Sequence, residues 1–207
     1  MRSWEQRSSR AAAPQERGDM SKRAVGSNPE GQEGFEKGTE ELVLAIALCL
    51  KVKLRTPALL LLYASIDIMG SLDRPESRPN VRFTEWADKY LLPDAGLACS
   101  AMDLWGARCG LLHTYISESD HSRQKKAREI YYGWDNDDTE YLQERIDHEG
   151  KGSVVVAVNA QHLFPAFGVG IRRFKQSLSK DLKKANLVYE RASKFFTFVP
   201  KSSIGVE

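Results

Sequence analysis

The segment Pro57–Leu72 constrains the fold most, because its residues are apolar around nearly the whole circumference of a helix. Pro57 suits the first turn of a helix, and the segment is followed by a loop over 73–79 with a proline at each of positions 75 and 79. A helix that is apolar on all sides is surrounded by other elements. The sequence therefore predicts a helical domain with Pro57–Leu72 as its central helix.

Further helices are expected on both sides of this segment. A first helix is predicted to begin at Thr39, where Thr-Glu-Glu precedes an apolar run, because acidic side chains are favoured at helix N-termini. A long helix is expected over Gly96–Ser117. Two more are expected over Ala160–Leu178 and Lys180–Thr197, where apolar residues recur at steps of three and four. These segments predict a mainly α fold, an up-and-down helical bundle.

A small β element is expected between the long helix and the last two. Residues 130–132 and 154–156 are short runs of β-favouring side chains. The acidic segment Asp135–Glu149 lies between them and is expected to be partly helical. We therefore expect a two-stranded element near 129–158.

The two ends of the chain have the composition of flexible segments. Residues 1–38 are rich in Arg, Ser, Gly and Glu and lack a periodic apolar pattern, so they are predicted to be a disordered arm. The helical domain is expected over 39–200, followed by a flexible tail over 201–207. Met20 is an alternative start of the chain.

Composition excludes several classes of protein. The three cysteines, Cys49, Cys99 and Cys109, are odd in number and lack CxxC spacing, which argues against a disulfide framework and a zinc site and favours a reducing cytoplasm. The apolar runs Leu42–Leu50 and Ala58–Ile66 are too short to cross a bilayer. We expect a cytoplasmic protein with no membrane segment, no metal and no cofactor. The net charge of +2 does not by itself indicate a nucleic-acid partner.

Arg108 interrupts the apolar stripe of the long helix. The stripe recurs at helical spacing and consists of Leu97, Ala101, Leu104, Leu111 and Tyr115. A charged side chain in such a stripe needs either a ligand or a partner, such as a buried acid. Asp67, in the most apolar helix, has the same need. It is expected to hold Arg108 or His113 in place, or else to pair with another cation.

A second row of the same helix contains Asp103, Gly106, Gly110 and His113. A glycine inside a helix costs about 1 kcal/mol relative to alanine, so two of them one turn apart indicate a closely packed backbone. That backbone is expected to come from a second copy of the chain, in a homodimer, or from the helix Pro57–Leu72. Asp103 is a candidate supporting residue on the face of His113.

The sequence Leu104-Trp-Gly-Ala-Arg108-Cys-Gly-Leu-Leu-His113 resembles the R-x4–6-H motif of the HEPN superfamily, including uncharacterised bacterial members. The resemblance extends over roughly 39–199 in helix order. It implies a dimeric, metal-independent endoribonuclease, with Arg108 and His113 as catalytic residues and RNA as substrate. Such proteins often act in toxin–antitoxin or phage-defence systems, so a nucleotidyltransferase-type antitoxin is an implied partner. In many members a polar residue follows the arginine, whereas Cys109 follows it here.

The sequence leaves open whether the chain cleaves RNA and whether its basic C-terminal helices bind it. Arg108 and His113 are five residues apart, which on an ideal helix separates them by about 140° and about 7.5 Å, so one chain alone brings them together poorly. The chain is alternatively a HEPN-like module that binds a nucleotide or a protein without cleaving RNA. The basic C-terminal helices are either a solvated face or a weak RNA-binding surface, for which the candidates are Arg172, Arg173, Lys183 and Lys184.

Overall fold

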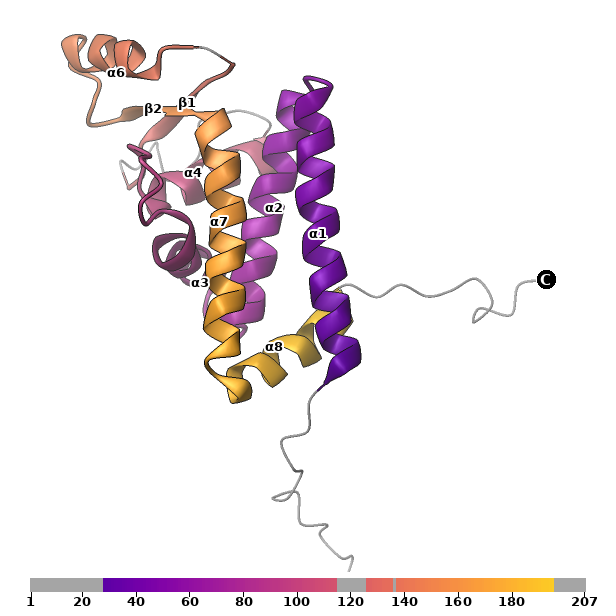
Figure 1. The fold of residues 1–207 in the computed structure, drawn as a ribbon. Coiled ribbons are helices and arrows are strands. Elements are labelled where there is room, and N and C mark those ends of the chain that lie inside the picture. Colours follow the sequence, from indigo (N-terminus) through magenta and orange to yellow (C-terminus); the bar gives the residue numbers. More distant parts are fainter. Residues whose placement is uncertain (1–27, 115–125, 136, 196–207) are drawn as a thin grey trace, which may run out of the picture.

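A computed structural model describes residues 28–114, 126–135 and 137–195, apart from the side chains of 112–114. In chain order the elements are α1 (Pro29–Lys51), α2 (Arg55–Asp73), α3 (Pro79–Trp86), the π-helix η2 (Ala87–Leu91), α4 (Ala101–Thr114), β1 (Glu129–Gly133), α6 (Thr139–His148), β2 (Val155–Asn159), α7 (Ala160–Ser179) and α8 (Leu182–Phe195). The helices α1, α2 and α7 run alongside one another, α8 crosses below their ends, and the strands and α6 lie at the other end (Figure 1). The predicted mainly α fold is confirmed.

The central position of the second helix is also confirmed. Helix α2 contacts α1, α3, α4, α7 and α8. Its side chains Leu62, Tyr63, Ile66 and Met69 are fully buried. Among the described residues, no helix has the length and apolar character needed to cross a membrane.

Helix α1 begins at Pro29 rather than at Thr39, so the prediction of a disordered arm over 1–38 is wrong for residues 29–38. The side chain of Asn28 caps the helix by accepting a hydrogen bond of 3.0 Å from the backbone N–H of Gly31. Pro29 occupies the first turn, where its missing N–H costs nothing. The predicted tail over 201–207 and residues 1–27 of the arm lie outside the described residues.

Tertiary packing explains why the early part of α1 is helical. Phe35 is fully buried, and its ring lies 6.0 Å from that of Phe174 on α7 and 5.8 Å from that of Tyr189 on α8. Gly31 leaves room for the backbone of Tyr189, which a Cβ at this position would overlap. Thr39 lies inside the helix and donates a hydrogen bond of 2.9 Å to the carbonyl of Glu36, so it does not act as the cap.

The two strands form the expected small β element. Strands β1 and β2 pair in parallel, with Glu129 opposite Val155 and Gly133 opposite Asn159. Parallel neighbours need a crossover connection, and α6 lies within this one. The acidic segment Asp135–Glu149 is therefore partly helical, as expected. Asn159 at the end of β2 caps α7 by accepting a hydrogen bond of 2.8 Å from the backbone N–H of Gln161.

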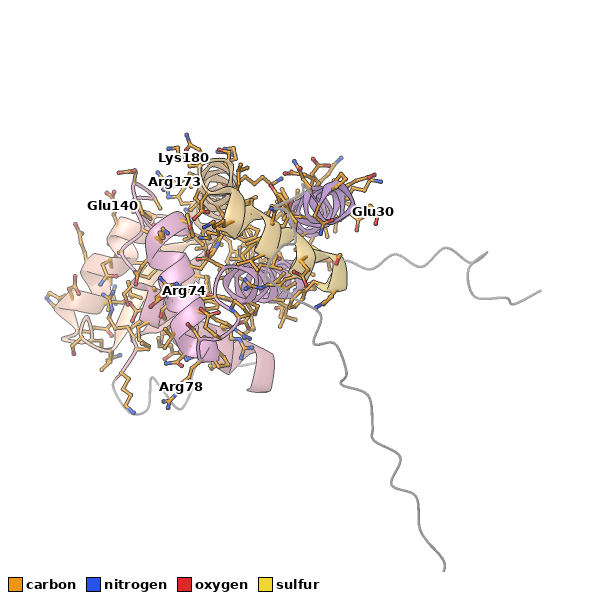
Figure 2. All side chains as sticks on the ribbon, turned by 90° about the horizontal axis from the view of Figure 1, so that it is seen from below. Glu30, Arg74, Arg78, Glu140, Arg173 and Lys180 are labelled. Atoms are coloured by element: carbon orange, nitrogen blue, oxygen red, sulfur yellow. The ribbon has the colours of Figure 1, made fainter. Side chains whose placement is uncertain are left out.

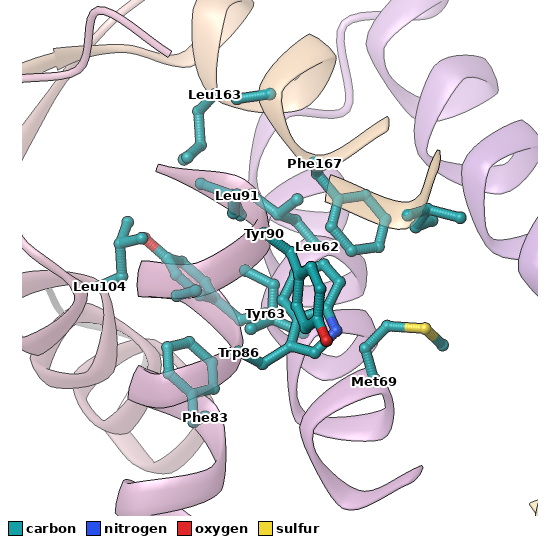
Figure 3. Packing of buried hydrophobic residues seen from close by; sticks show 14 of the residues in the cluster. Leu62, Tyr63, Met69, Phe83, Trp86, Tyr90, Leu91, Leu104, Leu163 and Phe167 are labelled. Atoms are coloured by element: carbon teal, nitrogen blue, oxygen red, sulfur yellow. The ribbon is translucent and has the colours of Figure 1, made fainter. Parts of the chain in front are cut away.

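An aromatic core joins α3 and η2 to α2 and α7 (Figure 3). The Trp86 ring lies 6.0 Å from that of Phe167 and 6.3 Å from that of Phe174. Gly170 lets α7 approach closely, because a Cβ there would stand 3.0 Å from Trp86 and 3.3 Å from the Cα of Leu91. This packing fixes α3 and η2 on the side of α2 that also receives α4.

Candidate functional site

Helix α4 begins at Ala101, not at Gly96 as predicted. Gly96 has a φ of 62°, in the left-handed region, which a right-handed helix does not contain. Ser100 and Asp103 form a reciprocal cap: the backbone N–H of Ser100 donates to Asp103 Oδ2 at 2.8 Å, and that of Asp103 donates to Ser100 Oγ at 3.1 Å. The predicted end at Ser117 lies outside the described residues.

Asp103 connects the start of α4 to the start of β1. It is 3% exposed and accepts hydrogen bonds from the backbone N–H of Arg128 at 2.6 Å and from its Nη2 at 2.8 Å. Burial alone raises the pKa of the Asp103 carboxyl, but hydrogen bonds from Arg128 and Ser100 outweigh that effect and hold the pKa below its usual value. These contacts give Asp103 a structural role, and its role as a supporting residue on the face of His113 stays a prediction.

Arg108 pairs with Asp67 across the contact between α4 and α2. Its Nε donates to Asp67 Oδ2 at 2.7 Å, and its Nη2 lies 2.5 Å from the same oxygen. The side chains are 19% and 15% exposed, so the pair is mostly buried but reaches the surface. The expectation that each of these charged groups needs a partner is met by this contact.

The guanidinium of Arg108 also lies over an aromatic ring. Its Cζ is 5.0 Å from the ring centroid of Trp105, which in turn lies 5.4 Å from that of Phe83 on α3. Such cation–π contacts contribute about 0.5–1 kcal/mol at exposed sites and more where water is excluded. The ion pair and the ring together fix the orientation of Arg108.

Asp67 has a second oxygen in a different environment. Its Oδ1 is buried and has no hydrogen-bond partner among the described residues. A buried acceptor of this kind is rare in folded proteins and indicates a missing donor, such as a water, a ligand or another side chain. The candidate site therefore contains an oriented arginine beside a buried carboxylate oxygen that has no partner among the described residues.

His113 lies in the last turn of α4, but its side chain is outside the described residues. The helix runs from Ala101 to Thr114 without a break at Gly110. The backbone therefore keeps the five-residue helical separation between Arg108 and His113. Gly106 and Gly110 are buried within the single chain, and α4 contacts α2, α3 and β1. That burial is consistent with packing of the two glycines against the same chain, which was the alternative to packing against a second copy.

The four basic candidates on the C-terminal helices divide into two pairs. Arg173 donates to Asp94 and to the carbonyl of Pro93 at 2.8 and 2.5 Å, and Lys184 pairs with Asp73. Burial tends to lower the pKa of Lys184, but the Asp73 carboxylate and the Tyr90 hydroxyl raise it above its usual value. Arg172 and Lys183 are exposed.

Two of the four basic side chains are engaged in contacts within the domain, and their predicted role in RNA binding stays a prediction. Figure 2 shows Arg173 and Lys180 at one edge of the molecule when it is seen from below, and seven residues of α7, or about 10 Å along the helix axis, separate them. Arg173 and Lys184 are engaged in ion pairs within the domain, so only Arg172 and Lys183 of the four are presented to solvent as exposed side chains.

A cavity of about 360 Å³, which no sequence pattern indicated, lies between α1 and α7. Its walls are mainly apolar, and Arg55, Asp135 and Gln161 form a polar end beside Trp134. Arg55 pairs with Asp135 at 3.0 Å and lies 5.2 Å from the Trp134 ring. Neither Arg108 nor Asp67 lines this cavity. Its residues come from segments far apart in the chain, so no local motif could have indicated it.

Within the part of the chain that the structure describes, no group of three or more His, Cys, Asp or Glu side chains is arranged to hold a metal ion. Comparisons with known proteins add no relative: the chain matches no family model, no curated protein and no solved structure. The fold and site define a mainly α protein with a central Arg–Asp pair, and membership of the HEPN superfamily stays a prediction.

Proposed function

We propose that this protein is a metal-independent endoribonuclease of the HEPN type, with Arg108 and His113 as its catalytic residues. The observation that supports the proposal is the orientation of Arg108. Asp67 and Trp105 hold its guanidinium near the surface, on the helix that also carries His113. A phosphate-binding arginine works best when its side chain is fixed before the substrate arrives.

The chemistry matches the two residue types. The 2′-hydroxyl of RNA attacks the adjacent phosphorus and gives its proton to a general base, while the bond to the 5′-oxygen breaks and that oxygen takes a proton. The products are a 2′,3′-cyclic phosphate and a 5′-hydroxyl. A histidine exchanges protons near neutral pH, and an arginine stabilises the charge that builds on the phosphate oxygens.

Asp67 is proposed as a positioning residue in this site. Its Oδ2 holds Arg108, which leaves the guanidinium with further N–H donors for a phosphate. Its buried Oδ1 is suited to accept a hydrogen bond from an imidazole N–H. The imidazole of His113 is the proposed donor. The proposed biological setting is a toxin or phage-defence effector with a nucleotidyltransferase-type antitoxin.

The test is cleavage of single-stranded RNA by the purified full chain in EDTA. His113→Ala and Arg108→Ala are each expected to abolish cleavage while circular dichroism shows an unchanged fold. His162→Ala is the matched control, because His162 lies on α7 and lines a cavity that includes neither Arg108 nor Asp67, so full activity is expected. Cleavage that survives both Arg108→Ala and His113→Ala would overturn the assignment.

A second candidate function is supported by the same ion pair. Asp67 neutralises the charge of Arg108 without any ligand. Cys109 also stands where many members of the superfamily have a polar residue. On this alternative the chain is a HEPN-like module that binds a nucleotide or a protein partner without cleaving RNA. Nucleotide binding by wild-type protein that cleaves none of a panel of RNAs would favour the alternative.

A further inference from the structure

Helix α1 presents a row of large apolar side chains to solvent. Leu44, Leu48 and Val52 are 58%, 52% and 62% exposed, and Val43 beside them is also exposed. The opposite side of the helix is buried through Phe35, Thr39 and Ile46 against the rest of the domain. Contiguous exposed apolar side chains on one helix face are typical of an interaction surface.

The spacing along this face is that of a helix that pairs with another helix. Lys37, Glu41, Leu44, Leu48 and Lys51 follow one another at steps of four, three, four and three residues. This alternation keeps side chains on one stripe and is the spacing of the contact positions in coiled coils. The two leucines lie at the centre of the stripe.

The charged side chains next to the two leucines are acidic on the N-terminal side and basic on the C-terminal side. Lys37, farther out on the stripe, is paired with Glu33 of the same helix at 2.6 Å. The acids Glu40 and Glu41 precede the leucines, and the bases Lys51 and Lys53 follow them, all with exposed side chains. Two parallel copies of this helix would place like charges together. Two antiparallel copies would place the acids of each against the bases of the other. Because one surface that pairs with itself is the requirement of a twofold dimer, the charge order favours a second copy as the partner.

We infer that two copies of this protein associate through antiparallel α1 helices about a twofold axis between Leu44 and Leu48. Leu44 of one copy packs against Leu48 of the other at the centre. Glu41 pairs with Lys51 of the other copy on each side of the axis. This surface differs from the Gly106/Gly110 face of α4 and does not depend on the proposed cleavage chemistry, because Arg108 and Asp67 belong to α4 and α2.

Sedimentation equilibrium of the full chain at tens of micromolar tests the central contact. A dimer is expected for the wild type, and Leu48→Glu is expected to weaken it at least tenfold while circular dichroism and the melting temperature show a folded chain. Leu187→Glu is the matched control, since Leu187 on α8 is 50% exposed but lies outside the α1 face, and it should leave the dimer unchanged. A wild-type monomer, or a Leu48→Glu dimer as tight as wild type, would overturn the inference.

A charge-exchange experiment tests the antiparallel arrangement itself. Glu41→Lys and Lys51→Glu each place like charges at both pairing positions, so each variant alone is expected to dimerise more weakly. Mixed together, E41K and K51E restore opposite charges at both positions and should form a heterodimer. The double variant E41K/K51E should likewise recover a homodimer. Failure of both the mixture and the double variant to recover association would overturn the antiparallel pairing.

Discussion

Arg108 and Asp67 each stand on an otherwise apolar helix face, and their contact shows how strongly burial dictates a partner. Both residues could be singled out from sequence because an unpaired charge in such a position is costly. That they pair with each other, and that the Arg108 guanidinium lies on Trp105, depends on how α2 and α4 pack. Sequence pattern left this choice between several partners open.

The Arg108–Asp67 pair predicts a measurable coupling. Asp67→Leu leaves a mostly buried guanidinium without its carboxylate and should lower the free energy of unfolding by about 2–4 kcal/mol. Replacing both residues, as Asp67→Leu with Arg108→Met, should recover much of that loss because no charge is left unpaired. Urea denaturation of the four proteins of this double-mutant cycle measures the coupling. Additive losses in the double variant would contradict a direct ion pair.

Cys99 is predicted to be an unreactive thiol. Burial and the nearby Asp103 charge raise the pKa of Cys99 to about 12, so at pH 8 only about one molecule in ten thousand carries the thiolate. Cys49 and Cys109 are only partly buried. Brief treatment with iodoacetamide followed by peptide mass spectrometry should label Cys49 and Cys109 well before Cys99. Labelling of Cys99 at a rate similar to theirs would show that it is accessible.

At the scale of elements, Asp103 fixes the start of α4 to the start of β1, and this predicts a pH dependence. The pKa of Asp103 in the folded chain lies below its ordinary value of 3.8, so its contribution to stability is complete above that value and is lost as pH falls through the folded pKa. Asp103→Asn should lower the free energy of unfolding by about 1–3 kcal/mol at pH 7. The difference from wild type should shrink towards pH 3 in urea titrations. A difference that is the same at both pH values would exclude a charge effect.

Two glycines of α7 provide a matched test of its packing on η2. A Cβ at Gly170 would press against Trp86 and Leu91, so Gly170→Ala should cost about 1–3 kcal/mol of stability. A Cβ at Gly168 would stand 3.8 Å from its nearest neighbour, Arg172, so Gly168→Ala should add about 0.5–1 kcal/mol through helix propensity. Thermal unfolding of both variants measures the contrast. Stabilisation by both would show that α7 does not pack as described.

At the scale of the whole molecule, local sequence patterns were sufficient to predict the helical fold class. They also predicted the central position of α2, because this helix is apolar on all sides. They were also sufficient for the two strands, whose β-branched and aromatic residues are local signals. The start of α1 was missed because Gly31, Gly34 and Gly38 are typical of flexible segments. The packing of Gly31 and Phe35 against α8 is visible only in the folded chain.

The candidate site divides in the same way. Arg108 and Asp67 were recognisable from their apolar surroundings, whereas the pairing of Asp103 with Arg128 joins residues whose contact no periodic pattern encodes. The cavity between α1 and α7 was likewise hidden, since its lining combines α1, α7 and the loop around Trp134. The sequence indicated which charged residues need a partner, and the packing of the helices determines which partner each of them contacts.

The central claim is that Arg108 and His113 cleave RNA by attack of its own 2′-hydroxyl, and the most direct measurement is mass spectrometry of the products from a defined RNA oligonucleotide in EDTA. The proposal predicts fragments that end in a 2′,3′-cyclic phosphate with matching 5′-hydroxyl fragments, and none with His113→Ala. A 2′-deoxy substitution at the cleaved nucleotide should block that cut. Fragments with 3′-hydroxyl and 5′-phosphate ends, or cleavage at the 2′-deoxy position, would contradict it.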